Sequence, residues 1–359
     1  FQYIGYKPFE FTVPAGRSSV TCDVALQGDS QTLDDVVVIA YGVRKKGTIA
    51  GSVSTVKAEK IEDTPAAAFD QALQGQVPGL TVLSDSGEPS EAAAMAIRGT
   101  NSINSGTAPL YILDGVAISS RDFNTINPSD IESLSVLKDA SSTSIYGARA
   151  ANGVIVITTK RGRMADRAKI NYRMQLGFSQ IAYGNWDLMD TDERIRYEKE
   201  TDVNWLDEVF SNAALLQNYE LSVSGASEKT NYYVSGGYYS QDGTAVGSSF
   251  ERYSIRANVE QRAAKWLKLG TNTMMNYQTI EKADDGEYTL TTPISAARFM
   301  LPYWNPHRAD GSLASVNDGS WKGEGQNPLE WLKNNPVDYK KYKIISTVFA
   351  EATPIEGLT

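Results

Sequence analysis

From Ala168 onward the chain alternates apolar and polar residues. Between Ile170 and Phe178 the even-numbered positions are apolar and the odd-numbered positions are mostly polar. The same alternation recurs in 219–224, 253–260 and 267–276. A period of two predicts β-strands with one apolar face. These runs are about ten residues long, and their polar face offers few groups of core size, which favours membrane-spanning strands over a soluble sandwich.

Two more segments bring the expected number of strands to about six. Residues 232–239 form a Tyr/Gly strand between turns, and 342–352 form a final strand. An interfacial girdle is expected from aromatic residues near the strand ends, namely Tyr219, Tyr253, Trp266 and Tyr277.

The connections between these strands are unequal in length. Those at 227–229 and 263–265 are short, the one at 241–249 is longer, and the one at 282–335 is much longer. Outer-membrane barrels have this asymmetry, with short turns on one side and long loops on the other. Six strands cannot close a barrel around the more than one hundred residues that precede them. We therefore expect the natural protein to continue past Thr359.

The stretch 130–162 predicts a βαβ-like unit. Its first strand lies in 131–137, and Asp139 offers a carboxylate cap to a short helix that ends near Tyr146. Gly147 can close that helix in a left-handed conformation. The β-branched run 154–157 predicts a strand buried on both faces. Alone, such a unit fits a small α/β domain of any function.

The preceding residues, 48–129, predict a compact α+β unit. Thr64 and Pro65 start a helix, and Gly75 follows its end. Asp114-Gly115 is a turn dipeptide. Short strands are expected at 52–56, 80–83, 95–98 and 110–113.

The N-terminal segments are the least regular. Residues 1–30 alternate loosely and predict the last strands of a β-sandwich, and 27–32 form a polar linker. The β-prone segment 33–42 has two interpretations. Composition favours an ordinary buried strand, and the functional alternative is a segment that pairs with the sheet edge of a partner.

Composition sets outer bounds on function. The chain has 359 residues, a net charge of -9 and a pI of about 4.9, which disfavours a non-specific nucleic-acid binder. No run of 18 apolar residues occurs, so no transmembrane helix is expected. No signal peptide is visible, and both ends look cut. The single cysteine, Cys22, leaves the redox compartment unreadable.

Constellations of catalytic residues are missing from the sequence. It contains no paired His motif, no Cys cluster and no phosphate-binding Gly loop. A Ser-His-Asp set would have to use His307, the only histidine, for which a solvated loop position is the simpler explanation. The acidic run 284–287 is short and could hold a cation, but a solvated turn is the simpler interpretation. We therefore expect no enzyme activity, no metal and no cofactor.

Several motifs together resemble one family. They are LDDVVVIAYG (33–42), LQGQVPGLTV (73–82), IRGTNSIN with PLYILDGV (97–116), DIESLSVLKDASSTSIYGARAANGVIVITTKRG (130–162), and NWLDEVF followed by NYELSVSGASEKTNYYVSGGYYSQDG (204–243). In this order they resemble the N-terminal portion of a SusC/RagA-like TonB-dependent outer-membrane transporter of Bacteroidetes-type bacteria. One departure is visible, because the stretch 197–204 is shorter than in similar members.

The resemblance implies a mainly β fold in which an α+β plug domain precedes the first strands of a transmembrane antiparallel β-barrel that is incomplete in this chain. Residues 1–30 would end a carboxypeptidase-regulatory-like β-sandwich domain, and 31–42 would hold a linker and the TonB box. Residues 43–163 would form the plug domain, and 164–359 the first barrel strands and loops.

The resemblance also implies a function, which is TonB-dependent import of an oligosaccharide or peptide across the bacterial outer membrane. The expected partners are TonB with ExbB and ExbD, a SusD-like lipoprotein, the cargo and outer-membrane lipid, with no nucleic acid. TonB would contact a short β-prone segment made of Asp34, Asp35, Val36, Val37, Val38 and Ile39.

Two other groups of residues follow from the resemblance. Arg98 and Lys138 would lock the plug against carboxylates of the barrel, because a buried cation needs an acidic or main-chain oxygen partner. Cargo would be contacted by plug apex loops through neutral polar side chains, namely Ser86, Asn101, Ser102, Asn104 and Ser105. A plain surface connection remains the alternative for these loops.

Two other functions remain open at this stage. A soluble or surface β-rich protein for carbohydrate binding or adhesion would share the alternating strands. A glycan hydrolase would need two carboxylates flanking a cleft, and the sequence gives no way to pair its many carboxylates. The apolar stripe of the strands favours the transporter.

Overall fold

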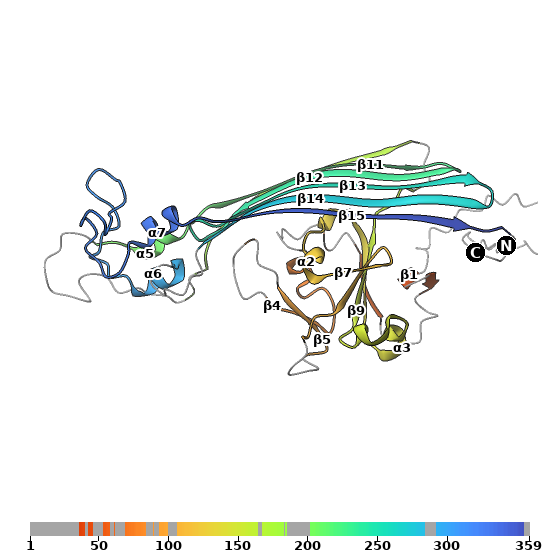
Figure 1. Ribbon diagram of the computed structural model, residues 1–359, viewed down its shortest axis with the longest axis horizontal. Coiled ribbons are helices and arrows are strands. Elements are labelled where there is room, and N and C mark those ends of the chain that lie inside the picture. The colour runs from red at the N-terminus through yellow and green to blue at the C-terminus, as the bar shows by residue number, and fades with distance from the viewer. Residues whose placement is uncertain are drawn as a thin grey trace, which may run out of the picture.

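The computed structural model describes residues 36–39, 42–45, 53–57, 61, 69–83, 89, 93–99, 106–163, 167–182, 184, 202–283 and 292–354. A long curved sheet lies along one side, and a smaller α+β domain lies against its concave face (Figure 1). The expected β-sandwich end at 1–30 lies wholly outside the described residues. Of the shortened stretch 197–204, only 202–204 are described.

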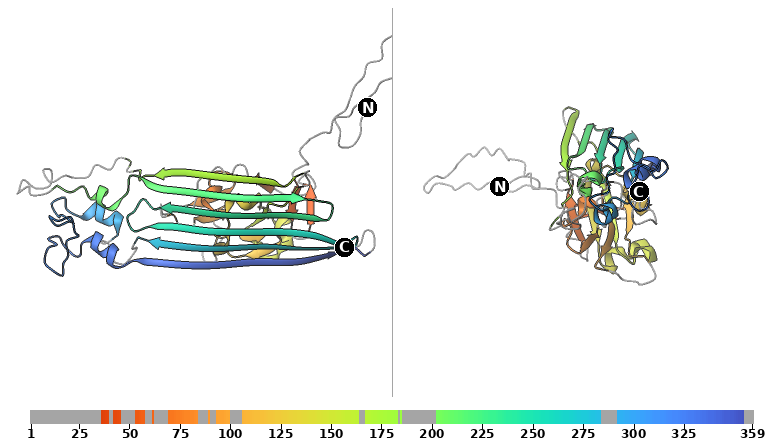
Figure 2. Two further views of the ribbon diagram at one scale, coloured as in Figure 1. Left: turned by 90° about the horizontal axis from the view of Figure 1, so that it is seen from above. Right: turned by 90° about the vertical axis from the view of Figure 1, so that its left-hand side faces the viewer.

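The long sheet has six strands in sequence order, each antiparallel to its neighbours. Figure 2 shows them side by side. The predicted strands are confirmed, but most are longer than the alternating runs. Their bounds are β10 Lys169–Ser179, β11 Ala214–Ala226, β12 Thr230–Asp242, β13 Ser249–Ala264, β14 Leu267–Lys282 and β15 Val337–Ala352.

The two faces of this sheet differ as the alternation predicts. On the outward face, away from the small domain, Ile170 is 70% exposed and Phe178 is 74% exposed. On the inward face of β13, the polar residues Ser254, Arg256 and Asn258 are buried. An apolar face toward the surroundings and a polar face toward the interior is the arrangement of membrane barrels, and the opposite of a soluble sandwich.

A row of tyrosines crosses the outward face of the sheet. The ring centroids of successive members lie 6.4, 4.9, 6.1 and 4.7 Å apart, and the row consists of Tyr219, Tyr238, Tyr253, Tyr277 and Tyr342. The prediction that Tyr219, Tyr253 and Tyr277 lie near strand ends is wrong, because the strands continue past them. The outward positions beyond the row are nevertheless polar on β11 to β15, namely Gln217, Ser240, Glu251, Thr279 and Lys340.

The apolar band on β14 has the thickness of a membrane. It runs from Leu267, beside the exposed Trp266, to Tyr277. At about 3.4 Å per residue and a strand tilt of about 40°, these ten steps span about 26 Å, close to the apolar band of outer-membrane barrels. On β10 the band lies further toward the long loops, from Ile170 to Phe178, as tilted strands require.

The small domain is built on a five-stranded sheet in the order β3-β8-β9-β6-β7. The central strand β9 is buried on both faces at Val154–Ile157, as predicted. The βαβ-like interpretation is wrong, because β8 and β9 are antiparallel and β9 is parallel to β6. The bounds are β3 Val53–Lys57, β6 Leu110–Leu113, β7 Val116–Ile118, β8 Ile131–Leu137 and β9 Val154–Thr159.

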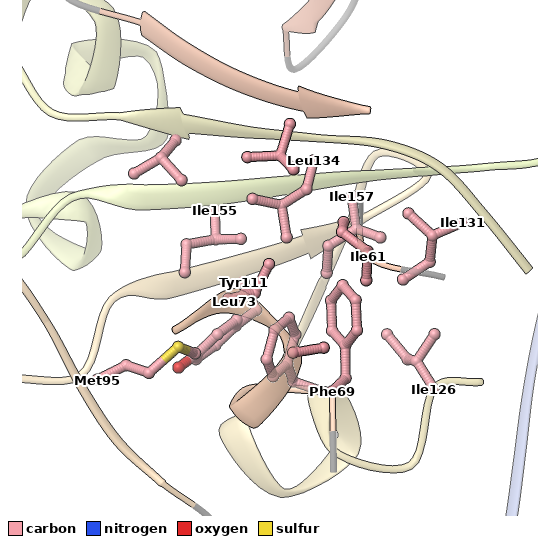
Figure 3. Close-up of a cluster of buried hydrophobic side chains, with 14 of the residues drawn as sticks. Ile61, Phe69, Leu73, Met95, Tyr111, Ile126, Ile131, Leu134, Ile155 and Ile157 are labelled. Carbon is pink, nitrogen blue, oxygen red and sulfur yellow. The ribbon is translucent and has the colours of Figure 1, made fainter. Parts of the chain in front are cut away.

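One apolar core fills the space beside this sheet (Figure 3). Phe69 and Phe123 pack in a tilted arrangement with ring centroids 4.8 Å apart, and Tyr111 packs on Phe123 at 4.5 Å. The expected turn at Asp114-Gly115 is confirmed, with φ of 47° and 90°. The strand pair β4 Leu80–Leu83 with β5 Ala94–Ile97 contributes Leu80, Val82, Met95 and Ile97 to the core. A separate pair is formed by β1 Val36–Ile39 with β2 Gly42–Lys45.

The helices that the structure describes in full in the small domain are short. Asp139 precedes α3, but its side chain makes no cap hydrogen bond, so the predicted carboxylate cap is wrong. That carboxylate pairs with Arg98 instead. Gly147 has the expected positive φ, and a 3-10 turn continues past it. The bounds are η2 Gln71–Leu73, α2 Ser120–Phe123, η3 Pro128–Asp130, α3 Ala140–Thr143 and η4 Ser144–Ala150.

A second apolar core lies beyond the long-loop end of the strands. It gathers Trp205, Ala297 and Trp321 from the β10–β11 and β14–β15 connections. Three helices carry much of it (Figure 1), namely α5 Trp205–Val209, α6 Pro293–Phe299 and α7 Pro328–Asn334. Within the described part of the chain, no helix combines the length and the apolar character needed to cross a membrane.

Candidate functional site

The candidate site is the contact between the small domain and the inward face of the long sheet. At its centre lies Arg256 of β13, which is 1% exposed. Its guanidinium lies 3.5 Å from the Asp130 carboxylate and 3.6 Å from the Asp114 carboxylate, both of the small domain. A buried cation is tolerated only when it is paired. Movement of the small domain away from the sheet would leave Arg256 unpaired, so these ion pairs favour the docked position.

Asp130 is held from two other directions. Tyr233 Oη donates to its carboxylate at 3.1 Å, and Ser235 Oγ donates to the same oxygen. Asp114 in turn accepts hydrogen bonds from the Thr159 main-chain N–H and from Thr159 Oγ1, at 3.0 and 2.7 Å. The β6–β7 turn and the start of β8 are thus attached to β12 and β13 through charge and hydrogen bonds.

Three asparagines extend the contact. Asn258 Nδ2 donates to Thr159 Oγ1 and to the Lys160 carbonyl, at 2.9 and 2.8 Å. Asn276 Nδ2 donates to the Thr125 carbonyl at 2.8 Å. From the other side, Asn127 Nδ2 donates to Ser254 Oγ at 3.4 Å. Asn258 and Asn276 thus supply donors to main-chain carbonyls of the small domain, at Lys160 and Thr125.

Two ion pairs lie at the periphery. Lys343 of β15 pairs with Asp122 at 2.5 Å, and Arg161 pairs with Glu260 of β13. Burial raises the pKa of Asp122, but its bonds with Lys343 and Ser119 outweigh that effect, and the net result is a pKa below the usual value. Asp122 therefore stays ionised and paired at neutral pH.

The backbones also approach closely. A Cβ added to Gly162 would lie 2.0 Å from the Gly225 carbonyl oxygen and 2.6 Å from that of Tyr232. A Cβ added to Gly237 would lie 2.9 Å from Ser254 Oγ and 3.0 Å from Asn127 Nδ2. Apolar packing contributes less, through Met274, which joins the core of the small domain.

This arrangement can hold a domain firmly and still release it. The contact is mostly polar, so water can replace its hydrogen bonds when the domain moves away, whereas an apolar contact would leave exposed hydrocarbon. Within the described residues, no group of three or more His, Cys, Asp or Glu side chains could hold a metal ion.

The predicted locking residues lie elsewhere on the small domain. Arg98 pairs with Asp139 at 2.5 Å, and Lys138 Nζ donates to Ser54 Oγ at 2.7 Å and to the Pro78 carbonyl oxygen. Burial, and then the nearby Arg98 guanidinium, lower the pKa of Lys138. These partners belong to the small domain itself, on the side that faces away from the long sheet (Figure 1). Contact of Arg98 and Lys138 with barrel carboxylates stays a prediction.

Most of the predicted cargo and TonB residues are not described. Ser86, Asn101, Ser102, Asn104, Ser105, Asp34 and Asp35 lie outside the described residues. The backbone of Val36–Ile39 is extended and pairs with Gly42–Lys45. Figure 1 places β1 near the hairpin end of the long sheet.

Of the expected apex loops, 84–90 and 99–107, the structure describes only 89, 99, 106 and 107, and the chain resumes at Ala93 after the first of them. The buried Asp70 accepts from the Ala93 main-chain N–H at 2.6 Å and from the Gln71 N–H at 2.7 Å. Burial raises the pKa of Asp70, against the lowering effect of these bonds. Asp70 thus fixes the chain just before β5, where the connection from β4 returns.

His307 is less solvated than the sequence suggested. Its Nε2 lies 2.9 Å from the Glu208 carboxylate, and the imidazole is 37% exposed. Glu208 belongs to α5, so the pair joins the β10–β11 and β14–β15 connections. The pair is peripheral to the contact around Arg256.

Sequence reasoning missed the residues that make this contact. It searched for basic residues in the small domain and acidic residues on the strands, and the central pair has the opposite polarity. One signal was available, because Arg256, Asn258 and Glu260 occupy the polar face of an alternating strand. Such groups need partners when the interior of a barrel is filled.

Comparisons with known proteins give consistent matches. Residues 45–154 match the family described as TonB-dependent Receptor Plug Domain. The chain is 33% identical to TonB-dependent receptor P26 of Formosa agariphila, over 99% of the chain and 37% of that relative. It is 34% identical to TonB-dependent receptor SusC of Bacteroides thetaiotaomicron, over 94% of the chain and 38% of that relative.

A solved structure shows the same architecture. The RagAB peptide importer in its open-open state aligns with a TM-score of 0.77 and 35% identity, over 90% of this chain and 41% of that chain. The chain thus spans less than two fifths of the length of the two curated relatives, at 37% and 38%.

Proposed function

The chain belongs to the SusC/RagA-like TonB-dependent receptors, and on that premise we propose that its protein imports a nutrient across the outer membrane. The observation that carries the proposal is a plug-type domain fastened by polar contacts to the inward face of membrane-type strands. An importer needs a passage that is closed at rest and opened by a specific input, and a releasable plug in a barrel meets both requirements.

We propose the following division of the chain. Residues 1–30 end a carboxypeptidase-regulatory-like domain, 31–42 hold the linker and TonB box, 43–163 form the plug, and 164–359 open the barrel. Support comes from the change of sheet after β9 and from the family match over 45–154. The chain contributes six barrel strands, and we propose that further strands complete the wall.

The input that opens the passage is a mechanical pull on the chain. TonB adds a strand to the segment 34–39 and pulls, with energy supplied through ExbB and ExbD. Within the described residues β1 pairs only with β2, so its other edge is available to a partner strand. The pull reaches the plug through β3, an edge strand of the five-stranded sheet. Edge strands detach more easily than central ones because they hold a single row of ladder hydrogen bonds.

The cargo is an oligosaccharide or a peptide. The RagAB peptide importer, which aligns over 90% of this chain, supports the peptide. We propose that the loops carrying Ser86 and 101–105 contact the cargo with neutral donors and acceptors. A SusD-like lipoprotein closes the barrel on its outer side. A catalytic step has no place in this scheme.

A soluble β-rich binding protein is disfavoured by the outward face. Val348 is 81% exposed, Tyr342 77% and Ile170 70%. A continuous apolar face of this kind in water is an aggregation liability, whereas lipid solvates it.

The test is energised uptake by cells that make the full-length protein. A labelled oligopeptide pool and a labelled oligosaccharide pool are supplied separately, with and without an uncoupler of the proton gradient. We expect import of one pool that stops with the uncoupler or without TonB, while surface binding persists. The proposal would be rejected if import continued both with the uncoupler and without TonB. It would also be rejected if the purified protein were stable in water without detergent.

A further inference from the structure

Three exposed basic residues lie at the hairpin end of the long sheet, at the edge of its apolar band that is nearer the short turns. Lys229 lies in the β11–β12 turn, Arg262 near the end of β13, and Lys265 in the β13–β14 turn. We call Lys229, Arg262 and Lys265 the hairpin-end cluster.

The members of the cluster are held next to one another. The Arg262 N–H donates to the Lys229 carbonyl at 2.7 Å, which joins the two hairpins, and Lys265 follows three residues after Arg262. Arg262 stands opposite Lys268 in the register, and the shift between Arg262 and Ala264 marks a bulge that directly follows it and leads into the turn with Lys265. Among the described residues, none of the three cations forms an ion pair.

The acids around the cluster are mostly engaged elsewhere. Glu260 pairs with Arg161 and Lys268, and Glu351 pairs with Lys268. Glu228, in the same turn as Lys229, is the remaining nearby acid. The cluster is therefore a net positive patch with uncommitted donors.

Its position identifies the level of the membrane surface. Trp266, 54% exposed, follows Lys265 directly and marks the end of the apolar band that begins at Tyr277. Tryptophan prefers the headgroup level of a bilayer, and lysine and arginine chains reach toward the interface. The opposite edge of the band is net negative, with Glu251, Glu281 and Asp338 beside Lys340 on the outward face.

We propose that the hairpin-end cluster binds the phosphate of an anionic phospholipid in the periplasmic leaflet, with Trp266 against its glycerol and upper acyl region. The proposal rests on the membrane location in the proposed function, but it needs neither TonB nor cargo. Attraction of a basic residue to an anionic membrane surface corresponds to about a five-fold gain in affinity for each cation. Three cations next to one another therefore select anionic over zwitterionic lipid.

The experiment uses the purified full-length protein in detergent, with lipid retention read by native mass spectrometry. The probes are palmitoyl-oleoyl-phosphatidylglycerol and palmitoyl-oleoyl-phosphatidylcholine at equal concentration. The test variant carries Lys229→Gln, Arg262→Gln and Lys265→Gln. The control removes three exposed lysines near the loop end, with Lys322→Gln, Lys333→Gln and Lys340→Gln. Heat-modifiable mobility on gels reports that each barrel is folded.

We expect the wild type and the control to retain phosphatidylglycerol over phosphatidylcholine. The cluster variant should lose at least ten-fold of that retention while remaining folded. Equal retention of the two lipids, or retention unchanged in the cluster variant, would overturn the proposal. Displacement of the lipid by an equal concentration of inorganic phosphate would also overturn it, in favour of a site for free anions. If uptake fails but selective retention persists, only the proposed function is lost.

Discussion

At the scale of residues, Arg256 joins the two parts of the molecule. It is fully enclosed, and its two carboxylate partners come from separate turns of the small domain. Removing the guanidinium would leave the buried carboxylates of Asp114 and Asp130 without the cation that pairs with both of them. Breaking a buried pair in this way typically costs about 3–5 kcal/mol, because the remaining charge is not solvated.

We therefore predict that Arg256→Met loosens the small domain from the sheet without unfolding the barrel. Limited proteolysis of the full-length protein should cut within 53–163 at least ten-fold faster, while heat-modifiable mobility stays unchanged. Adding Asp130→Asn should recover part of the protection, because the unpaired charge is removed. Lys322→Met is the control, since Lys322 is exposed and bonds only a neighbouring carbonyl. Equal protection of Arg256→Met and wild type would show that the ion pairs do not fasten the domain.

The residue scale is also where sequence reasoning failed most. Asp139 was expected to cap α3, yet it pairs with Arg98, which lies far away in the sequence. Rules based on the local sequence pattern consider only partners that are close in the sequence. They contain no information about a cation that the fold places beside Asp139 from another part of the chain. The same limit hid Asp114 and Asp130, whose partners lie on a strand more than a hundred residues away.

At the scale of elements, the prediction was most reliable where one physical constraint repeats. The strands of the long sheet were found because an apolar face and a polar face alternate along each of them. Their lengths were underestimated, because the outward face becomes polar beyond the tyrosine row while the ladder hydrogen bonds continue. The parallel pairing of β6 with β9 was missed, since nothing local specifies which strand a buried strand joins.

The β14–β15 connection offers an element-scale prediction at Asn327, which is fully buried. Its Nδ2 donates to the Pro306 and Ala314 carbonyls at 2.8 Å each, and its Oδ1 caps α7 at the Leu329 N–H. Asn327→Ala removes the Nδ2 donor from the Ala314 carbonyl and from the Pro306 carbonyl, which keeps only the Ala314 N–H, and it also removes the cap, so the second core should lose at least about 2 kcal/mol.

Proteolytic cleavage within 292–336 measures that loss. Asn335→Ala is the matched control, because Asn335 is exposed and bonds only the Trp331 carbonyl one helical turn earlier. The Asn327 variant should be cut much faster than wild type, and the control should be cut at the wild-type rate. Similar cleavage of both variants would mean that Asn327 does not organise the connection.

At the scale of the whole molecule, the second core, the small domain and β1 follow one another along the length of the long sheet (Figure 1). Figure 1 places β1 at the hairpin end and the second core at the loop end, with the small domain between them. Force applied at β1 therefore acts on a domain whose strongest described contacts to the wall come from its later half, residues 114–161. Fold class could be predicted from the sequence because the family motifs cover most of the chain. The placement of the two domains could not, since it depends on the contacts around Arg256.

The central claim is that 34–39 transmits force and contributes little to stability. The most direct measurement is uptake of the imported pool by cells that express the full-length protein with Val37→Pro, beside Val37→Thr as control. Proline removes a ladder donor and blocks strand addition, whereas threonine keeps both. We predict that Val37→Pro abolishes uptake, while surface level, cargo binding and thermal stability equal those of wild type and Val37→Thr. Normal uptake by Val37→Pro, or loss of its fold, would contradict the account.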